Sequence, residues 1–200
     1  MVLGGQPPGR VGRRRIFERP PRAGVRLSRL VRVELRDGDL ILRPFSLDDV
    51  PAITRACQDP EILRWIPVIP RPYTEADARS FVTADDLGHQ FAIVESDELI
   101  GSIGMRVNQF ETGHIGYWCA REARGRGLTP RALRLVARFG LEQLGLGRLE
   151  LITDPDNLAS QRVAEKVGFR QEAVLRSHLL HPDGRRRDSV MFSLLPGELR

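Results

Sequence analysis

The residues best suited to chemistry in this 200-residue chain form a short loop, residues 124–129, which reads RGRGLT. A helix is expected to begin at Thr129 and Pro130, because threonine is a good N-cap and proline suits the first helical position. Gly125 and Gly127 free the backbone for positive φ and for close approach of a ligand. Successive N–H groups and the positive end of a helix dipole bind anions. The loop therefore predicts a phosphate site.

Two common nucleotide-binding motifs do not fit this loop. The P-loop motif needs lysine and then serine or threonine after its last glycine, where Leu128 and Thr129 stand. The dinucleotide fingerprint needs a third glycine three residues after the second, where Pro130 stands.

The loop fits a third pattern, R-x-x-G-x-G/A, with Thr129 at the position where glycine or alanine is usual. It is preceded by IGYW at 115–118 and followed by DPDNLASQRVAEKVGFR at 154–170 and HPDGRRRDSVMFSLL at 181–195. In this order the segments resemble the GNAT superfamily of acyl-CoA-dependent N-acyltransferases. The resemblance covers about residues 37–195 and is strongest to the branch of the ribosomal-protein-alanine N-acetyltransferases.

This resemblance implies an acetyl-CoA-dependent N-acetyltransferase. Acetyl-CoA would be the co-substrate, without a metal, and the acceptor would be a primary amine, either a protein or peptide N-terminus or a small molecule. The backbone at the end of the strand would bind the pantetheine arm, and the loop would bind the pyrophosphate. The implied cofactor contacts are Tyr117, Trp118, Cys119, Arg124, Gly125, Arg126, Gly127, Leu128, Thr129 and Asn157.

His114 is the candidate general base. The family branch often has a carboxylate five residues before the position of Cys119, and this chain has histidine there. An unperturbed imidazole titrates near neutral pH and suits proton uptake from an ammonium group, usually through water. The alternative is a polar residue at a strand start, without a catalytic role.

Ser160 is the candidate general acid. Many members of the superfamily use a tyrosine seven residues after the motif asparagine, but Ala164 stands there. The chain resembles instead those members with serine three residues after Asn157, so Ser160 would protonate the leaving thiolate. The alternative is a serine at a helix start that bonds the backbone.

Direct transfer is the expected mechanism. Cys119 raises the possibility of a covalent acyl-enzyme, but the sequence places no histidine or acid to activate its thiol.

Together with the hydrophobic periodicity, the GNAT resemblance implies a mixed α/β (α+β) domain: a twisted, mostly antiparallel sheet of about seven strands with one parallel pair, flanked by about four helices. The expected strands are 40–43, 90–95, 98–107, 112–119, 149–153, 169–180 and 188–195, and the expected helices include 47–56, 60–65, 75–86, 130–144 and 157–167. Trp65, Ile69 and Tyr73 would line an acceptor pocket or serve packing alone.

The basic character of the chain is confined to its start. Residues 1–36 carry ten arginines against two glutamates, a net charge of +8, so the chain's +5 leaves 5 − 8 = −3 for 37–200. This segment is rich in proline and glycine and is expected to be disordered. It is an electrostatic arm for RNA or the ribosome, an extension without function, or an upstream extension from a misplaced start codon. Residues 37–200 are expected to form one domain.

Two further features of the sequence bear on where the protein is located. The chain has two cysteines and no apolar run of about 20 residues, which favours the cytoplasm and argues against a membrane span.

Alternatives to acetyl transfer are a non-catalytic acyl-CoA sensor, transfer of a larger acyl group such as succinyl, modification of an amine antibiotic, and an RNA-binding arm on an inert domain. A homodimer would be in keeping with the family resemblance.

Overall fold

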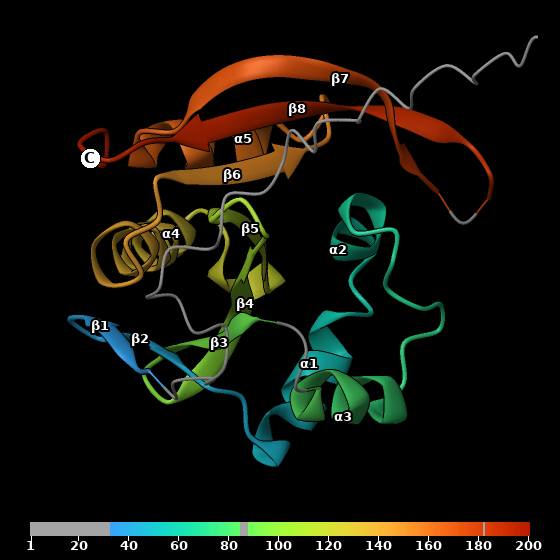
Figure 1. The fold of residues 1–200 in the computed structure, drawn as a ribbon. Helices are drawn as coiled ribbons and strands as arrows, with labels where there is room; N and C mark the ends of the chain where they lie inside the picture. Colours follow the sequence, from blue (N-terminus) through green and yellow to red (C-terminus); the bar gives the residue numbers. More distant parts are fainter. Residues whose placement is uncertain (1–32, 85–87, 182) are drawn as a thin grey trace, which may run out of the picture.

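The structure is a computed structural model that describes residues 33–84, 88–181 and 183–200. In this part of the chain, eight strands form one sheet in the order β1-β2-β3-β4-β5-β6-β8-β7 (Figure 1). The strands are β1 (Leu35–Asp37), β2 (Leu40–Arg43), β3 (His89–Glu95), β4 (Glu98–Val107), β5 (Thr112–Cys119), β6 (Arg148–Thr153), β7 (Arg170–Leu180) and β8 (Arg186–Leu194). Only β5 and β6 are parallel, which confirms the expected single parallel pair.

Five α-helices flank this sheet within the described ranges: α1 (Val50–Ala56), α2 (Pro60–Trp65), α3 (Glu75–Thr83), α4 (Leu128–Arg138) and α5 (Leu158–Val167). Helix α4 connects β5 to β6, as a parallel pair requires. In Figure 1, α4 and α5 lie on one side of the sheet and α1 and α3 on the other.

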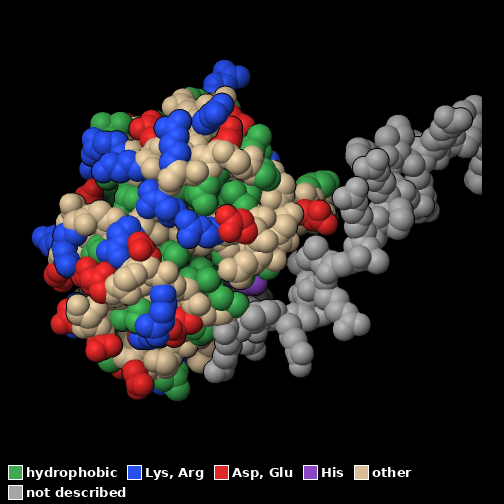
Figure 2. All heavy atoms as spheres, turned by 90° about the vertical axis from the view of Figure 1, so that its left-hand side faces the viewer, with side chains coloured by type: hydrophobic (Ala, Val, Ile, Leu, Met, Phe, Trp, Pro, Cys, Tyr) green, Lys and Arg blue, Asp and Glu red, His purple; other side chains and the backbone are tan. Residues whose placement is uncertain are grey.

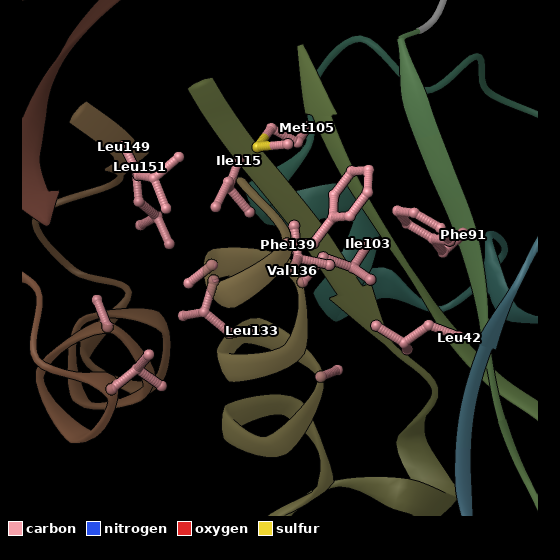
Figure 3. Packing of buried hydrophobic residues seen from close by; sticks show 14 of the residues in the cluster. Leu42, Phe91, Ile103, Met105, Ile115, Leu133, Val136, Phe139, Leu149 and Leu151 are labelled. Carbon is pink, nitrogen blue, oxygen red and sulfur yellow. The ribbon is translucent and has the colours of Figure 1, made fainter. Parts of the chain in front are cut away.

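The main core lies between the sheet and α4. Leu133 and Val136 of α4 are fully buried and face side chains of the central strands, among them Ile103 and Met105 (Figure 3). A smaller cluster on the opposite face joins α1 and α3 and includes Trp118. The alternation along β5 is therefore as expected, because Ile115, Tyr117 and Cys119 pack against the main core while Trp118 packs against the other cluster.

Two helix boundaries differ from the sequence predictions. The helix expected at 130–144 begins earlier, at Leu128, and changes at Phe139 into a π-helical turn, Phe139–Gln143. The helix expected at 75–86 ends earlier, at Thr83, because its C-cap Ala84 has an extended backbone conformation. The expected disordered tail lies, up to residue 32, outside the described residues, and β1 places Leu35 in the main core.

Charges on the folded domain are mixed. Figure 2 shows Lys and Arg side chains interspersed with Asp and Glu on the face that lies at the left of Figure 1. This agrees with the sequence, in which the basic excess belongs to the first 36 residues. Within the described residues, none of the helices has the length and apolar character needed to cross a bilayer.

Candidate active site

The sheet opens between β5 and β6. These parallel strands pair only between residues 112–115 and 148–151. Beyond Ile115, β5 pairs with β4 alone as far as Cys119, while β6 pairs with β8 alone. A strand edge without a neighbour carries free N–H and C=O groups. The C-terminal half of β5 thus presents a backbone edge that an extended ligand can pair with.

The glycine-rich loop follows this edge and leads into α4. Gly125 and Gly127 have φ values of 76° and 79°, and the space around a Cβ at either position is open. The expectation that Thr129 caps the helix is wrong, because the left-handed Gly127 is the N-cap and the helix begins at Leu128. Pro130 still lies in the first turn, where it has no N–H to lose. The glycine-rich loop and the helix N-terminus are therefore adjacent, as an anion site requires.

The loop arginines are held by carboxylates. Arg124 Nη2 lies 2.7 Å from Asp59 Oδ2, and Arg124 Nε donates to the Cys119 carbonyl over 3.2 Å. Arg126 Nη2 lies 2.6 Å from Glu95 Oε2. Arg124 thereby fixes the loop to the start of α2. Each guanidinium already uses some of its N–H donors, so neither has all of them available for an anion.

His114 lies in the part of β5 that is still paired with β6, and both its ring nitrogens have partners. Nδ1 is 3.1 Å from Glu150 Oε2, and Nε2 is 3.0 Å from Asn108 Nδ2. The Asn108 Oδ1 atom accepts hydrogen bonds from the backbone N–H groups of Phe110 and Thr112, so its amide nitrogen must face the imidazole. An amide N–H can only donate, so Nε2 is the acceptor and Nδ1 carries the hydrogen that is donated to Glu150.

Sequence reasoning missed both partners of His114. Glu150 faces His114 directly across the parallel pair, and its side chain is only 12% exposed. A charged residue between Leu149 and Leu151 in an otherwise apolar strand was the available signal. Asn108 lies in the turn before β5, where asparagine is common for local reasons and carries no such signal.

Ser160 lies in the first turn of α5 and meets a hydroxyl from β5. Asn157 caps this helix, with its Oδ1 atom accepting from the Ser160 backbone N–H over 3.0 Å. Ser160 Oγ lies 3.0 Å from the Tyr117 hydroxyl, which also donates to the Ser160 carbonyl over 3.2 Å. Burial raises the pKa of Tyr117 to about 12, against a smaller effect of its hydrogen bond with Ser160, so the phenol keeps its proton at neutral pH. The two hydroxyl groups form a pair that sequence reasoning did not connect.

A cavity of about 610 Å³ joins these groups. It reaches from His114 to Ser160, and its wall opposite the sheet is mostly apolar. Trp65, Ile69 and Tyr73, the residues proposed from the sequence for an acceptor pocket, all line it, and Tyr73 is also part of the smaller core cluster. The space is of the size that small-molecule sites commonly have.

The two cysteines near the site are poor nucleophiles. Burial raises the pKa of the Cys119 thiol, although hydrogen bonding with Thr129 acts in the opposite direction. Burial raises the pKa of Cys57 to about 11. Since the thiolate is the reactive form, this arrangement gives neither cysteine the activation that a covalent intermediate needs.

Comparison with known proteins agrees with this geometry. Residues 39–170 match the family model of the acetyltransferase (GNAT) domain. The chain is 29% identical over 170 residues to the uncharacterized N-acetyltransferase p20 of Bacillus licheniformis, which covers 80% of this chain and 94% of that protein. It is 32% identical over 113 residues to the ribosomal-protein-serine acetyltransferase of Escherichia coli, covering 52% of this chain and 62% of that one.

The fold is shared with solved structures. The crystal structure of a GNAT-family acetyltransferase from Bacillus anthracis superposes with a TM-score of 0.74, with 82% of this chain and 98% of that chain covered at 23% identity. The family match covers most of the chain, and the sheet that opens beside a glycine-rich loop and a helix N-terminus is present in the structure. The chain therefore belongs to the GNAT family and is an acetyl-CoA-dependent N-acetyltransferase.

Proposed function

We propose that this enzyme acetylates the N-terminal amine of a protein or peptide by direct transfer from acetyl-CoA. The observation that carries the proposal is the opening between β5 and β6, because Gly116 and Trp118 on its free edge line the same cavity as His114 and Ser160. A relative that is named for a protein acceptor, the ribosomal-protein-serine acetyltransferase, supports the choice. Two unpaired cysteines among the described residues suit the cytoplasm as its location.

The residues present fit acetyl-CoA. The open space around Gly125 and Gly127 and the N-terminus of α4 suit the pyrophosphate. The free edge of β5 from Gly116 to Cys119 suits the pantetheine arm, whose amides can pair with it as a further strand would. When bound, acetyl-CoA supplies an activated thioester.

The residues of this chain would then divide the remaining tasks. His114 takes a proton from the incoming ammonium, directly or through water, and a backbone N–H near the end of β5 polarises the thioester carbonyl. The amine nitrogen forms a bond to the carbonyl carbon, the carbon–sulfur bond breaks, and the nitrogen gives up its second proton to water. Ser160 donates its hydroxyl proton to the departing sulfur, and Tyr117 can resupply that proton because the two oxygens are 3.0 Å apart. The Tyr117 phenolate then takes a proton from the solvent.

The test is free-thiol release from acetyl-CoA with a panel of N-terminal peptides, polyamines and aminoglycosides. We expect turnover with peptides and none with the other two classes. Turnover only with small amines would overturn the acceptor assignment. Binding of acetyl-CoA with no turnover on any acceptor would favour a sensor or a different acyl donor.

A further inference from the structure

A second hollow of about 400 Å³ lies next to the cavity of about 610 Å³ that His114 and Ser160 line. It is formed where the C-terminal end of α2 meets the loop after β6 and the β7–β8 hairpin (Figure 1). Its lining is strongly charged and consists of Arg64, Trp65, Asp154, Asp156, His181, Arg185, Arg186 and Arg187. The four arginines and two aspartates give the lining a net charge of 4 − 2 = +2 when His181 is neutral.

Two of these arginines have structural roles. Arg187 forms an ion pair with Asp154 and donates through Nη2 to the Trp65 carbonyl over 3.1 Å. Arg185 is paired with Asp183 over 2.8 Å. These contacts account for part of the DGRRRD segment, because Arg187 joins β8 to both the loop after β6 and the end of α2.

The other two arginines have no carboxylate partner within the described ranges. The Arg64 guanidinium lies over the Trp65 ring, 4.4 Å from its centroid. Arg186 donates through Nη1 to the Ser177 carbonyl over 3.0 Å, which uses one of its five N–H donors. The guanidinium group is planar and matches carboxylate and phosphate groups. An anion between Arg64 and Arg186 would offset the repulsion of these like charges.

Trp65 connects this hollow to the site of chemistry. This residue lines the 610 Å³ cavity as well as the basic hollow. A molecule whose amine lies near His114 can therefore continue past Trp65 and place a further group between the arginines. The two hollows together exceed what one small amine fills, whereas an extended peptide, at about 3.3 Å per residue, can span both.

We propose that the basic hollow is an acceptor subsite that binds carboxylate side chains of an acidic peptide, a few residues after the N-terminus that is acetylated. This inference rests on the proposed peptide acceptor and specifies its sequence. Arg64 and Arg186 are the specificity-determining residues. Asp156, which also lines the hollow, disfavours a carboxylate close to itself and directs the ligand toward the two arginines.

The test compares two octapeptides that begin Ala-Leu and carry either Glu or Gln at positions three to six. With the full chain and saturating acetyl-CoA, we expect the Glu peptide to have a kcat/KM about three- to tenfold higher, mainly through KM, as one or two partly exposed ion pairs provide. The preference should shrink at high salt, because exposed charges are screened. The double variant Arg64→Gln/Arg186→Gln should lose the preference.

Arg138→Gln is the matched control, since Arg138 is exposed at the end of α4 on the other side of the sheet. It should retain the preference. Equal use of both peptides, or a preference that survives in the double variant, would overturn this inference while leaving peptide acetylation in place. Absence of turnover with either peptide would instead contradict the proposed function. Preference for phosphoethanolamine over ethanolamine without a difference between the peptides would assign the hollow to phosphate and overturn the peptide assignment.

Discussion

The amide nitrogen of Asn108 lies 3.0 Å from Nε2 of His114 and fixes which ring nitrogen of the histidine carries hydrogen. The lone pair that a general base needs is therefore on Nε2, but it is engaged by Asn108. To take a proton at this atom, His114 must exchange Asn108 for the acceptor amine or for a water. The turn that holds Asn108 is thus part of the catalytic arrangement we propose.

Replacing this amide with a carboxylate should block the base. In Asn108→Asp, one oxygen keeps the backbone hydrogen bonds and the other faces Nε2, which must then carry a hydrogen. We expect turnover to fall by about tenfold or more, since general base catalysis typically contributes at least that much. The ring ¹⁵N spectrum should show hydrogen on both nitrogens in the variant and on Nδ1 alone in the neutral ring of the native chain. Hydrogen on Nε2 in the native neutral ring would contradict the assignment.

The hydroxyl pair of Ser160 and Tyr117 should matter for chemistry and not for binding acetyl-CoA. We expect Ser160→Ala to lower kcat by about 10²-fold and Tyr117→Phe by about tenfold, with acetyl-CoA affinity retained. Ser189→Ala is the control, because it removes a buried hydroxyl that contacts His178 rather than the cavity. Rates equal to that control in both variants would remove the pair from the mechanism.

Burial of the Tyr117 hydroxyl should make the stability of the protein depend on pH in the alkaline range. Burial raises the pKa of Tyr117 from the ordinary tyrosine value of about 10 to about 12, so its contribution to folding is complete below pH 10 and is lost as pH rises toward 12. Thermal unfolding of Tyr117→Phe should depend less on pH in this window than unfolding of the native chain. Parallel pH profiles for the two proteins would rule out this contribution.

The left-handed conformation of Gly127 should be needed for binding acetyl-CoA. A residue with a Cβ costs about 1–2 kcal/mol in this conformation, so Gly127→Ala should shift the loop and weaken affinity by about tenfold in calorimetric titration. Gly145→Ala is a matched control, since Gly145 also has a positive φ, 68°, and open space around a Cβ. Its variant should lose similar stability but retain affinity. Equal affinity in both variants would argue against backbone recognition by this loop.

The ion pair between Arg43 and Asp49 should stabilise the start of α1. It is bidentate, with both N–O distances 2.8 Å, and the Asp49 side chain is only 5% exposed. We expect Asp49→Asn to lower the free energy of unfolding by about 1–3 kcal/mol, less than for a fully buried pair because Arg43 is partly exposed. Asp48→Asn, at the exposed neighbouring position, should change it by about 0.5 kcal/mol or less.

Acid pH should also remove the stabilisation that the ionised Asp49 provides. Burial opposes ionisation of Asp49, but the hydrogen bonds from Arg43 and Ser46 outweigh it and lower the pKa of this carboxyl. A lowered pKa means that the contribution is present above the unfolded value of about 3.9 and is lost as pH falls below it. Urea unfolding at pH 6 and pH 3 should show that the gap between the native chain and Asp49→Asn narrows at the lower pH.

The sequence by itself determined the family, the order of the main elements and the position of the glycine-rich loop, because these depend on local patterns. Alternating residues fixed which face of β5 holds Ile115, and glycine at 125 and 127 marked positive φ. The helix start was misplaced, since Thr129 and Pro130 carry strong local signals while the left-handed Gly127 overrides them.

Only the tertiary structure decided how the functional side chains are paired. Glu150 contacts His114 because the register of the parallel pair places them side by side. Tyr117 of β5 contacts Ser160 of α5, which lies 43 residues later in the chain. Arg124 was expected to face phosphate, yet a carboxylate 65 residues earlier in the chain, Asp59, holds it. Partners so distant in sequence leave no local pattern, because their contact depends on packing of the whole domain.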